Sequence, residues 1–213
     1  MNRPRHFKKV ISASRRVDLV TFYPNYTADS IKEIGFENIH TLVIWTKNPE
    51  NILSHPGLKK CFEELEQIYI LLTVTGLGGT PLEPFAPEIE KVFDQLPKII
   101  DFIGSSQRLA IRYDPLIDVV YKGKIRISNI DTNLFDKVLE KSSKLGIKRI
   151  IVSYVTLYKK VIERLKWNEF EVVDHNTEEI TDFIKNKMMA RVKKLGMELS
   201  TCVLPNLTTR GCI

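Results

Sequence analysis

The chain has 213 residues, of which 43% are hydrophobic and 27% charged, and its formal net charge is +6. This profile is typical of a folded globule, so intrinsic disorder is not the expected state of the chain. No apolar run approaches the roughly 20 residues that a membrane-spanning helix needs, and the polar, basic stretch Met1–Lys9 does not resemble a secretion leader. We therefore expect a cytoplasmic protein that does not bind a membrane.

Short runs of apolar or β-branched residues alternate with helical patterns along the chain. The predicted strands are Val10–Ser14, Thr41–Thr46, Tyr69–Thr75, Leu109–Tyr113, Arg149–Val155 and Glu198–Leu204. The predicted helices are Thr27–Ile34, Pro49–Glu66, Pro87–Ile103, Thr132–Leu145 and Thr177–Leu195. Helix ends are indicated by the glycines Gly35, Gly104, Gly146 and Gly196. The strand runs are continuously apolar, which predicts parallel strands buried on both faces.

Alternating strands and helices specify a parallel sheet with right-handed crossovers. The expected fold class is α/β: a partial (β/α) barrel, TIM-like, with about six parallel strands in a single domain over residues 1–213. An open doubly wound sheet is the alternative. Both architectures place function at the carboxyl ends of the strands.

The residues that follow the predicted strands are unusually polar. In a parallel sheet they converge on one opening, where arginine, lysine and hydroxyl groups would form a cationic cup suited to a phosphate or carboxylate. We therefore expect an anionic small-molecule ligand. The predicted ligand-binding residues are Ser12, Ser14, Arg15, Arg16, Asp18, Trp45, Lys47, Asn48, Thr73, Thr75, Arg112, Tyr113 and Ser153.

Two carboxylates near the same opening are the catalytic candidates. Asp114 either orients the guanidinium of Arg112 or acts as a general base, and Glu83 is the other candidate. No metal site is expected, because the histidines are not paired at metal-ligand spacing and are interpreted as structural or exposed. These histidines are His6, His40, His55 and His175.

Five short strings occur in the order in which a known family carries them. They are Ile11–Asp18, Trp45–Pro49, Thr73–Gly76, Leu82–Pro84 and Arg112–Pro115. On these strings the chain resembles the family catalogued as domain of unknown function 1848. The resemblance extends to Cys202 and Gly211–Ile213, and so covers nearly the whole chain.

This resemblance implies a radical-SAM-like partial barrel, similar in layout to the spore photoproduct lyase group. Members of the family continue into a cysteine cluster, so a [4Fe–4S] cluster and S-adenosylmethionine are implied for a full-length form. Cys61, Cys202 and Cys212 do not have the spacing of that cluster, and no cofactor is expected in this chain. A truncated chain is the favoured explanation, and a natural short form is the alternative.

Three functions remain open. The first is the barrel of a radical-SAM-like enzyme, and the second is a metal-free barrel that binds a phosphorylated or carboxylated small molecule. The third is a nucleic-acid-binding module that uses the basic N-terminus and the stretch Lys185–Lys194. Sparse aromatic residues in this stretch count against base stacking. No pattern in the sequence predicts an oligomeric state.

Overall fold

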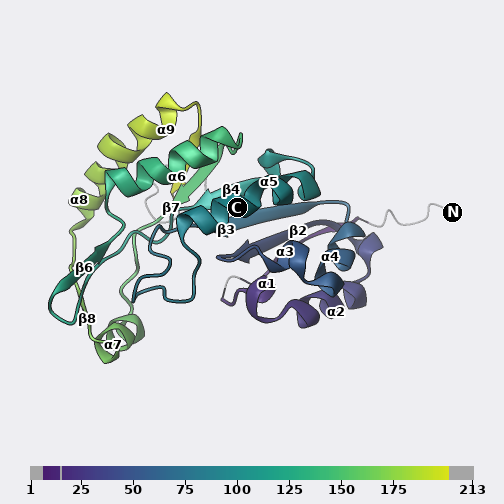
Figure 1. Cartoon of the computed structure of the whole chain (residues 1–213), viewed down its shortest axis with the longest axis horizontal. Coiled ribbons are helices and arrows are strands. Elements are labelled where there is room, and N and C mark those ends of the chain that lie inside the picture. The colour runs from purple at the N-terminus through teal and green to yellow at the C-terminus, as the bar shows by residue number, and fades with distance from the viewer. Residues whose placement is uncertain (1–6, 15, 202–213) are drawn as a thin grey trace. The chain divides into compact units, whose positions relative to one another are not determined.

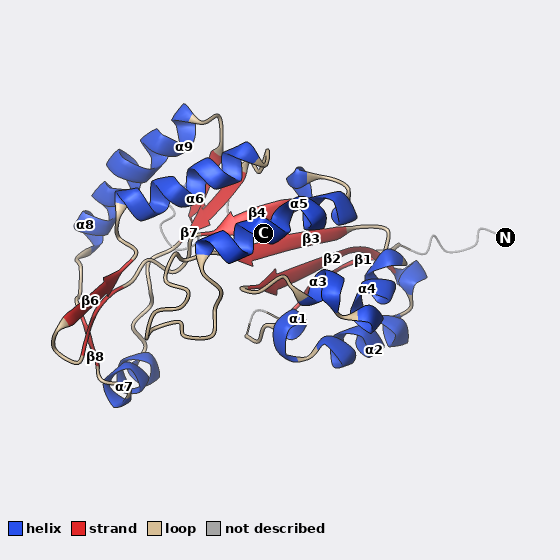
Figure 2. Cartoon of the chain, in the orientation of Figure 1, coloured by secondary structure: helices blue, strands red, loops and turns tan. Residues whose placement is uncertain are grey.

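The computed structural model describes residues 7–14 and 16–201 (Figures 1 and 2). By its internal contacts the chain divides into two compact units. The first runs up to Leu72 and includes Val92–Leu109, and the second comprises Thr73–Lys91 and the chain from Ala110 onward. The expectation of a single domain over residues 1–213 stays a prediction.

The first unit is built from parallel strands and short helices. Its elements are β1 (Lys9–Ala13), α1 (Leu19–Phe22), α2 (Pro24–Ile34), η1 (Phe36–Asn38), β2 (Ile39–Thr46), α3 (Asn51–Ser54), α4 (Pro56–Glu63), β3 (Ile68–Thr73), most of α5 (Ile89–Ile103) and η2 (Ser106–Arg108). Strand β2 pairs in parallel with both β1 and β3. Helices α2 and α4 pack against each other, and the core includes Ile44, Ile70, Leu58 and Phe62.

Two details of the first unit differ from the sequence prediction. The predicted helix Pro49–Glu66 is split into α3 and α4, because His55 precedes Pro56 and is therefore extended rather than helical. The ring of His55 then caps α4 by accepting the backbone N–H of Leu58. Strand β1 was expected to be buried on both faces, but its side chain Val10 is 64% exposed. It is also an edge strand, because no described strand pairs with its outer side.

The second unit combines parallel strands with a second kind of sheet. Its elements are β4 (Leu109–Arg112), β5 (Asp118–Tyr121), β6 (Ile125–Ser128), α6 (Thr132–Lys144), β7 (Arg149–Val152), α7 (Lys159–Trp167), β8 (Phe170–Val172), α8 (Thr177–Asp182), the π-helical segment η3 (Phe183–Met189), α9 (Ala190–Lys194) and β9 (Glu198–Thr201). Strand β7 pairs in parallel with β4 and with β9. In both units the glycines predicted to end helices have positive φ, namely Gly35, Gly104, Gly146 and Gly196.

Together these elements confirm the expected α/β class as a partial β/α fold. Among the described residues six strands pair in parallel, three in each unit, and all six lie where the sequence predicts them. The central strands are buried because their runs are continuously apolar, as in Ile70–Leu72 and Ile150–Val152.

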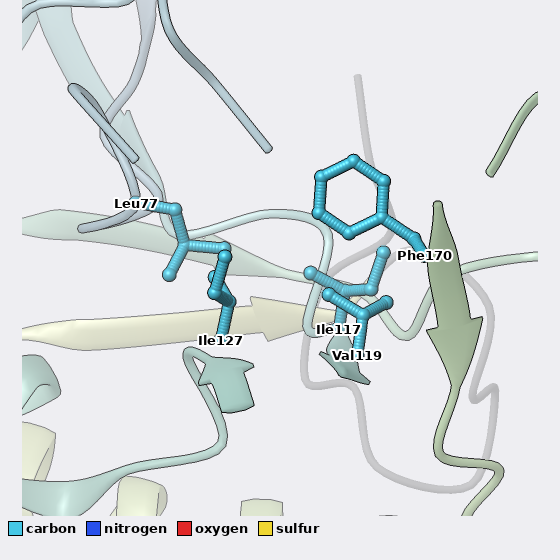
Figure 3. Packing of buried hydrophobic residues seen from close by; sticks show 5 residues of the cluster. All are labelled: Leu77, Ile117, Val119, Ile127 and Phe170. Carbon is cyan, nitrogen blue, oxygen red and sulfur yellow. The ribbon is translucent and has the colours of Figure 1, made fainter. Parts of the chain in front are cut away.

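A three-stranded antiparallel sheet in the second unit was not predicted. Strand β5 lies between β6 and β8, and pairs antiparallel with both. One face of this sheet packs onto the loop after β3 and onto α6 and α7, through side chains that include Leu82, Leu134 and Leu165. Figure 3 shows the centre of this small core, which is formed by Leu77, Ile117, Val119, Ile127 and Phe170.

The loop after β3 is held tightly by a glycine. A Cβ atom at Gly78 would lie 2.1 Å from the carbonyl oxygen of Pro87, which is backbone and cannot rotate away. We expect Gly78→Ala to lower the free energy of unfolding by about 2–3 kcal/mol, measured by urea titration. Gly57→Ala in α4 is the control, because its Cβ would meet His55 at an ordinary 3.5 Å. Equal stability of the two variants would contradict this close approach.

Candidate functional site

The candidate site lies in the second unit, at the carboxyl ends of β4 and β7. Asp114 follows β4 with its side chain only 5% exposed, and its carboxylate accepts hydrogen bonds from the guanidinium of Arg112 and from the hydroxyl of Ser153. The backbone bond from Tyr113 N–H to the carbonyl of Ile151 carries the strand pairing past the end of β4. This pairing brings Asp114 and Ser153, which are 39 residues apart, into contact.

The loop after β3 reaches the same strand end. The backbone N–H of Val74 donates to the carbonyl of Arg112 at 2.9 Å, so Thr75 follows directly beside the end of β4. The Thr75 hydroxyl then donates to the Glu83 carboxylate at 2.7 Å. The structure therefore brings five predicted site residues to one edge of the second unit: Thr75, Glu83, Arg112, Asp114 and Ser153. Thr73 ends β3 just before this loop.

Asn129 is a structural centre of this edge that sequence reasoning missed. Its amide donates to the carbonyls of Pro115 at 2.9 Å and of Thr75 at 3.3 Å, and its oxygen accepts the N–H of Ile117 at 2.7 Å. The side chain is fully buried. The pattern Ser-Asn-Ile before a helix start was the available signal, but asparagine in a loop commonly indicates only a turn.

The structure places Tyr113 in the core. Its ring packs edge-on against Phe135 with centroids 5.1 Å apart, and its hydroxyl donates to the carbonyl of Asn129 at 2.8 Å. Burial raises the pKa of this hydroxyl above its ordinary value. Tyr113 therefore supports the loop from within the core rather than facing solvent.

The other predicted ligand-binding residues lie in the first unit. Asp18 caps α1 by accepting the N–H of Thr21, and its second oxygen accepts the Thr46 hydroxyl and the Lys47 N–H, each at 2.8 Å. This carboxylate thus joins the end of β2 to the start of α1. In addition, the oxygen of the Thr46 hydroxyl accepts the backbone N–H of Asn48 at 3.1 Å.

Three further hydrogen bonds order the carboxyl ends of β1 and β2. The indole of Trp45 donates to the hydroxyl of Ser12 at 3.1 Å, and the Ser14 hydroxyl accepts the backbone N–H groups of Arg16 and Val17. Arg15 lies outside the described residues. The expectation that the polar residues of both units share one opening stays a prediction.

A second polar cluster, also missed, lies on the antiparallel sheet. Asp118 on β5 has a side chain only 1% exposed, and it accepts bonds from Arg126 Nε at 3.0 Å, Arg126 Nη2 at 2.6 Å and His175 Nε2 at 2.9 Å. Burial opposes ionisation, but these bonds outweigh it and hold the pKa of the carboxyl below its ordinary value. The alternating pattern Asp118–Ser128 around a Lys-Gly turn was a hairpin signal that could have revealed the sheet.

The described residues do not fit an iron–sulfur cluster. Cys61 in α4 is buried, its thiol donates to the carbonyl of Ala28, and burial raises the pKa of the thiol, which disfavours the thiolate that a metal binds. No group of three His, Cys, Asp or Glu side chains is placed to hold a metal in the part of the chain that the structure describes. Cys202 and Cys212 lie outside it.

The basic stretch Lys185–Lys194 forms parts of η3 and α9. Arg191 in this stretch forms an ion pair with Asp136 of α6, with Nε and Oδ1 2.8 Å apart, and so joins α9 to α6 within the second unit. Nucleic-acid binding by this stretch stays a prediction.

Within residues 7–14 and 16–201, no helix is long and apolar enough to cross a membrane. The cytoplasmic location stays a prediction.

The fold and the site define an α/β protein with a buried polar cluster at the carboxyl ends of parallel strands. The chain belongs to the family described as Domain of unknown function (DUF1848), whose family model matches residues 10–212. No curated protein and no solved structure is similar enough to the chain to count as a match.

Proposed function

We propose that the chain is a small-molecule-binding domain whose ligand carries a phosphate or carboxylate group, bound at the carboxyl ends of β4 and β7. The observation that carries this proposal is the contact of Arg112 with Asp114 and of Asp114 with Ser153. A guanidinium offers five donors in a rigid fork and can bind more than one acceptor group at once.

Preorganisation supports the proposal. Asp114 is buried and its position is fixed by Ser153, so the Arg112 head is held at the strand end before any ligand arrives. Holding a long side chain in its bound position lowers the entropy cost of binding. The Arg112 side chain is 23% exposed, which leaves part of its surface in contact with solvent.

The neighbouring carboxylates restrict the ligand further. Glu83 and Asp114 would repel a bare anion, so we propose that the ligand carries hydroxyl or amino donors beside its anionic group. Glu83 is more exposed than Asp114 and receives the Thr75 hydroxyl. In this proposal Glu83 accepts the ligand's hydroxyl or amino donors and Asp114 positions Arg112.

Ligand-induced stabilisation tests the proposal. In a thermal-shift screen of sugar phosphates, amino acids and carboxylic acids, we expect at least one compound to raise the melting temperature. At a ligand concentration of about 100 times the Kd, binding raises the free energy of unfolding by roughly 2.7 kcal/mol. Arg112→Gln should abolish the shift, whereas Arg164→Gln on the exposed face of α7 should retain it. A screen without any shift, or a shift that Arg112→Gln leaves intact, would contradict the proposal.

A second candidate is the barrel of a radical-SAM-like enzyme. The five family strings and the parallel β/α arrangement favour it, although the described cysteine does not fit a cluster. The test is anaerobic reconstitution of the polypeptide encoded by the complete reading frame with iron and sulfide. An iron–sulfur absorption band supports this candidate, and a colourless protein that contains no iron contradicts it.

A further inference from the structure

His175, in the loop between β8 and α8, faces a carboxylate with each of its ring nitrogens. Nε2 lies 2.9 Å from Asp118 Oδ2, and Nδ1 lies 3.3 Å from Glu179 Oε2. A neutral imidazole carries a single N–H and can donate to one of these carboxylates only, whereas the imidazolium donates to both. The geometry of the two contacts is therefore satisfied in full only by the protonated ring.

We propose that His175 is a protonation-dependent clamp that fastens α8 to the antiparallel sheet and loosens when the ring loses its proton. Asp118 belongs to β5, the central strand of that sheet, and Glu179 belongs to α8. One ring thus joins two elements that are not neighbours along the chain. Loss of one proton from the ring removes one of the two hydrogen bonds through which His175 connects β5 to α8.

The charged groups around the ring act in both directions. Arg126 on β6 already donates to both oxygens of Asp118, which reduces the pull of that carboxylate on a second cation. Asp118 is nevertheless only 1% exposed, so its bond to His175 is little screened by water. Glu179 is 58% exposed and supplies the weaker, proton-dependent second contact.

The remaining neighbours hold the ring in place. The Tyr154 hydroxyl accepts the backbone N–H of His175 at 3.1 Å and lies 3.5 Å from the carboxylate of Asp174. Burial raises the pKa of this hydroxyl, so it stays neutral across the range in which histidine titrates.

The clamp lies close along the chain to the candidate site. Strand β5 begins at Asp118, shortly after Asp114, and Leu116 between them pairs with Tyr154. Protonation of His175 therefore affects how firmly the segment that follows the site is held. This inference concerns the protein without ligand and does not depend on the proposed function.

Amide hydrogen exchange tests the clamp directly. We compare wild type at about pH 5.5 and about pH 8, on either side of the histidine titration range, after correction for intrinsic exchange rates. Only the imidazolium can donate to both Asp118 and Glu179, so the clamp predicts protection at the lower pH that is lost as the pH rises. We expect amides of Thr177–Asp182 and Asp118–Tyr121 to be about tenfold better protected at the lower pH, as for one charge-assisted hydrogen bond.

Two variants and one control separate the clamp from general effects of pH. His175→Gln and Glu179→Gln should each abolish the difference in α8, and Glu179→Gln changes only a half-exposed side chain, so that the fold is retained. His40→Gln is the matched control, because His40 faces Glu66 at 3.5 Å in the first unit. It should keep the wild-type difference in α8.

Two results would overturn the clamp. The first is equal protection of α8 in wild type at both pH values, or a difference that survives in Glu179→Gln. The second comes from ¹⁵N NMR of the wild-type ring: the clamp requires both nitrogens to carry protons at about pH 5.5. A ring with one protonated nitrogen under this condition contradicts it.

Discussion

Replacing Asn129 by alanine is expected to lower the free energy of unfolding by about 3–5 kcal/mol, the largest effect of any single substitution considered. The amide of Asn129 satisfies two buried carbonyls and one buried N–H, which belong to Thr75, Pro115 and Ile117. Alanine leaves all three without this partner, and each unsatisfied buried polar group costs about 1–3 kcal/mol, partly recovered by relaxation. Urea titration followed by circular dichroism measures the change.

An exposed asparagine serves as the control for Asn129. The amide of Asn168 donates to the carbonyl of Arg164 at the end of α7, where water can replace it. We expect Asn168→Ala to cost less than about 1 kcal/mol. If Asn129→Ala were as mild as this control, Asn129 would not be the structural centre of the site.

The second large effect is expected from Asp118→Asn, which removes the charge that receives Arg126 and His175. Breaking a buried ion pair by removing one partner costs about 3–5 kcal/mol, and we expect about 3 kcal/mol at neutral pH, because Arg126 is largely exposed and regains water. The half-exposed pair of Asp136 with Arg191 provides the control, for which Asp136→Asn should cost less than about 1 kcal/mol.

The effect of Asp118→Asn should depend on pH. Because the pKa of the Asp118 carboxyl is lowered in the folded protein, its contribution is complete above the ordinary aspartate value of about 4 and is lost as the pH falls through the lower folded value. The difference in unfolding free energy between wild type and variant should therefore be largest at neutral pH and shrink in acid. A difference that is constant down to about pH 2 would show that the charge of Asp118 does not carry the effect.

Much of the fold follows from local patterns in the sequence. The apolar runs that become β2, β3 and β7 are buried as predicted, and the predicted helix Thr132–Leu145 matches α6 except that it runs one residue too far. A strand or helix period is a property of neighbouring residues, so it can be read without knowing the rest of the chain. Pro56 is a local signal of the same kind, because the residue before a proline is disfavoured in a helix.

The antiparallel sheet could not be placed from such patterns. Strands β5, β6 and β8 are three or four residues long, and β8 lies far along the chain from the hairpin that it joins. Runs this short carry little periodic signal, and their pairing depends on burial against Leu77 and Phe170 in a core assembled from distant segments.

Strand ends are local features, so the order of residues along the chain is enough to predict which polar residues follow the parallel strands. The fold sets which side chains touch: Asp114 meets Ser153 across 39 positions, and Asp118, which was not among the predicted residues, meets His175 across 57. It also placed Tyr113 in the core and made Asn129 the residue that joins three backbone segments. Hydrogen bonds between distant residues depend on how strands align in space, and no spacing along the chain records that alignment.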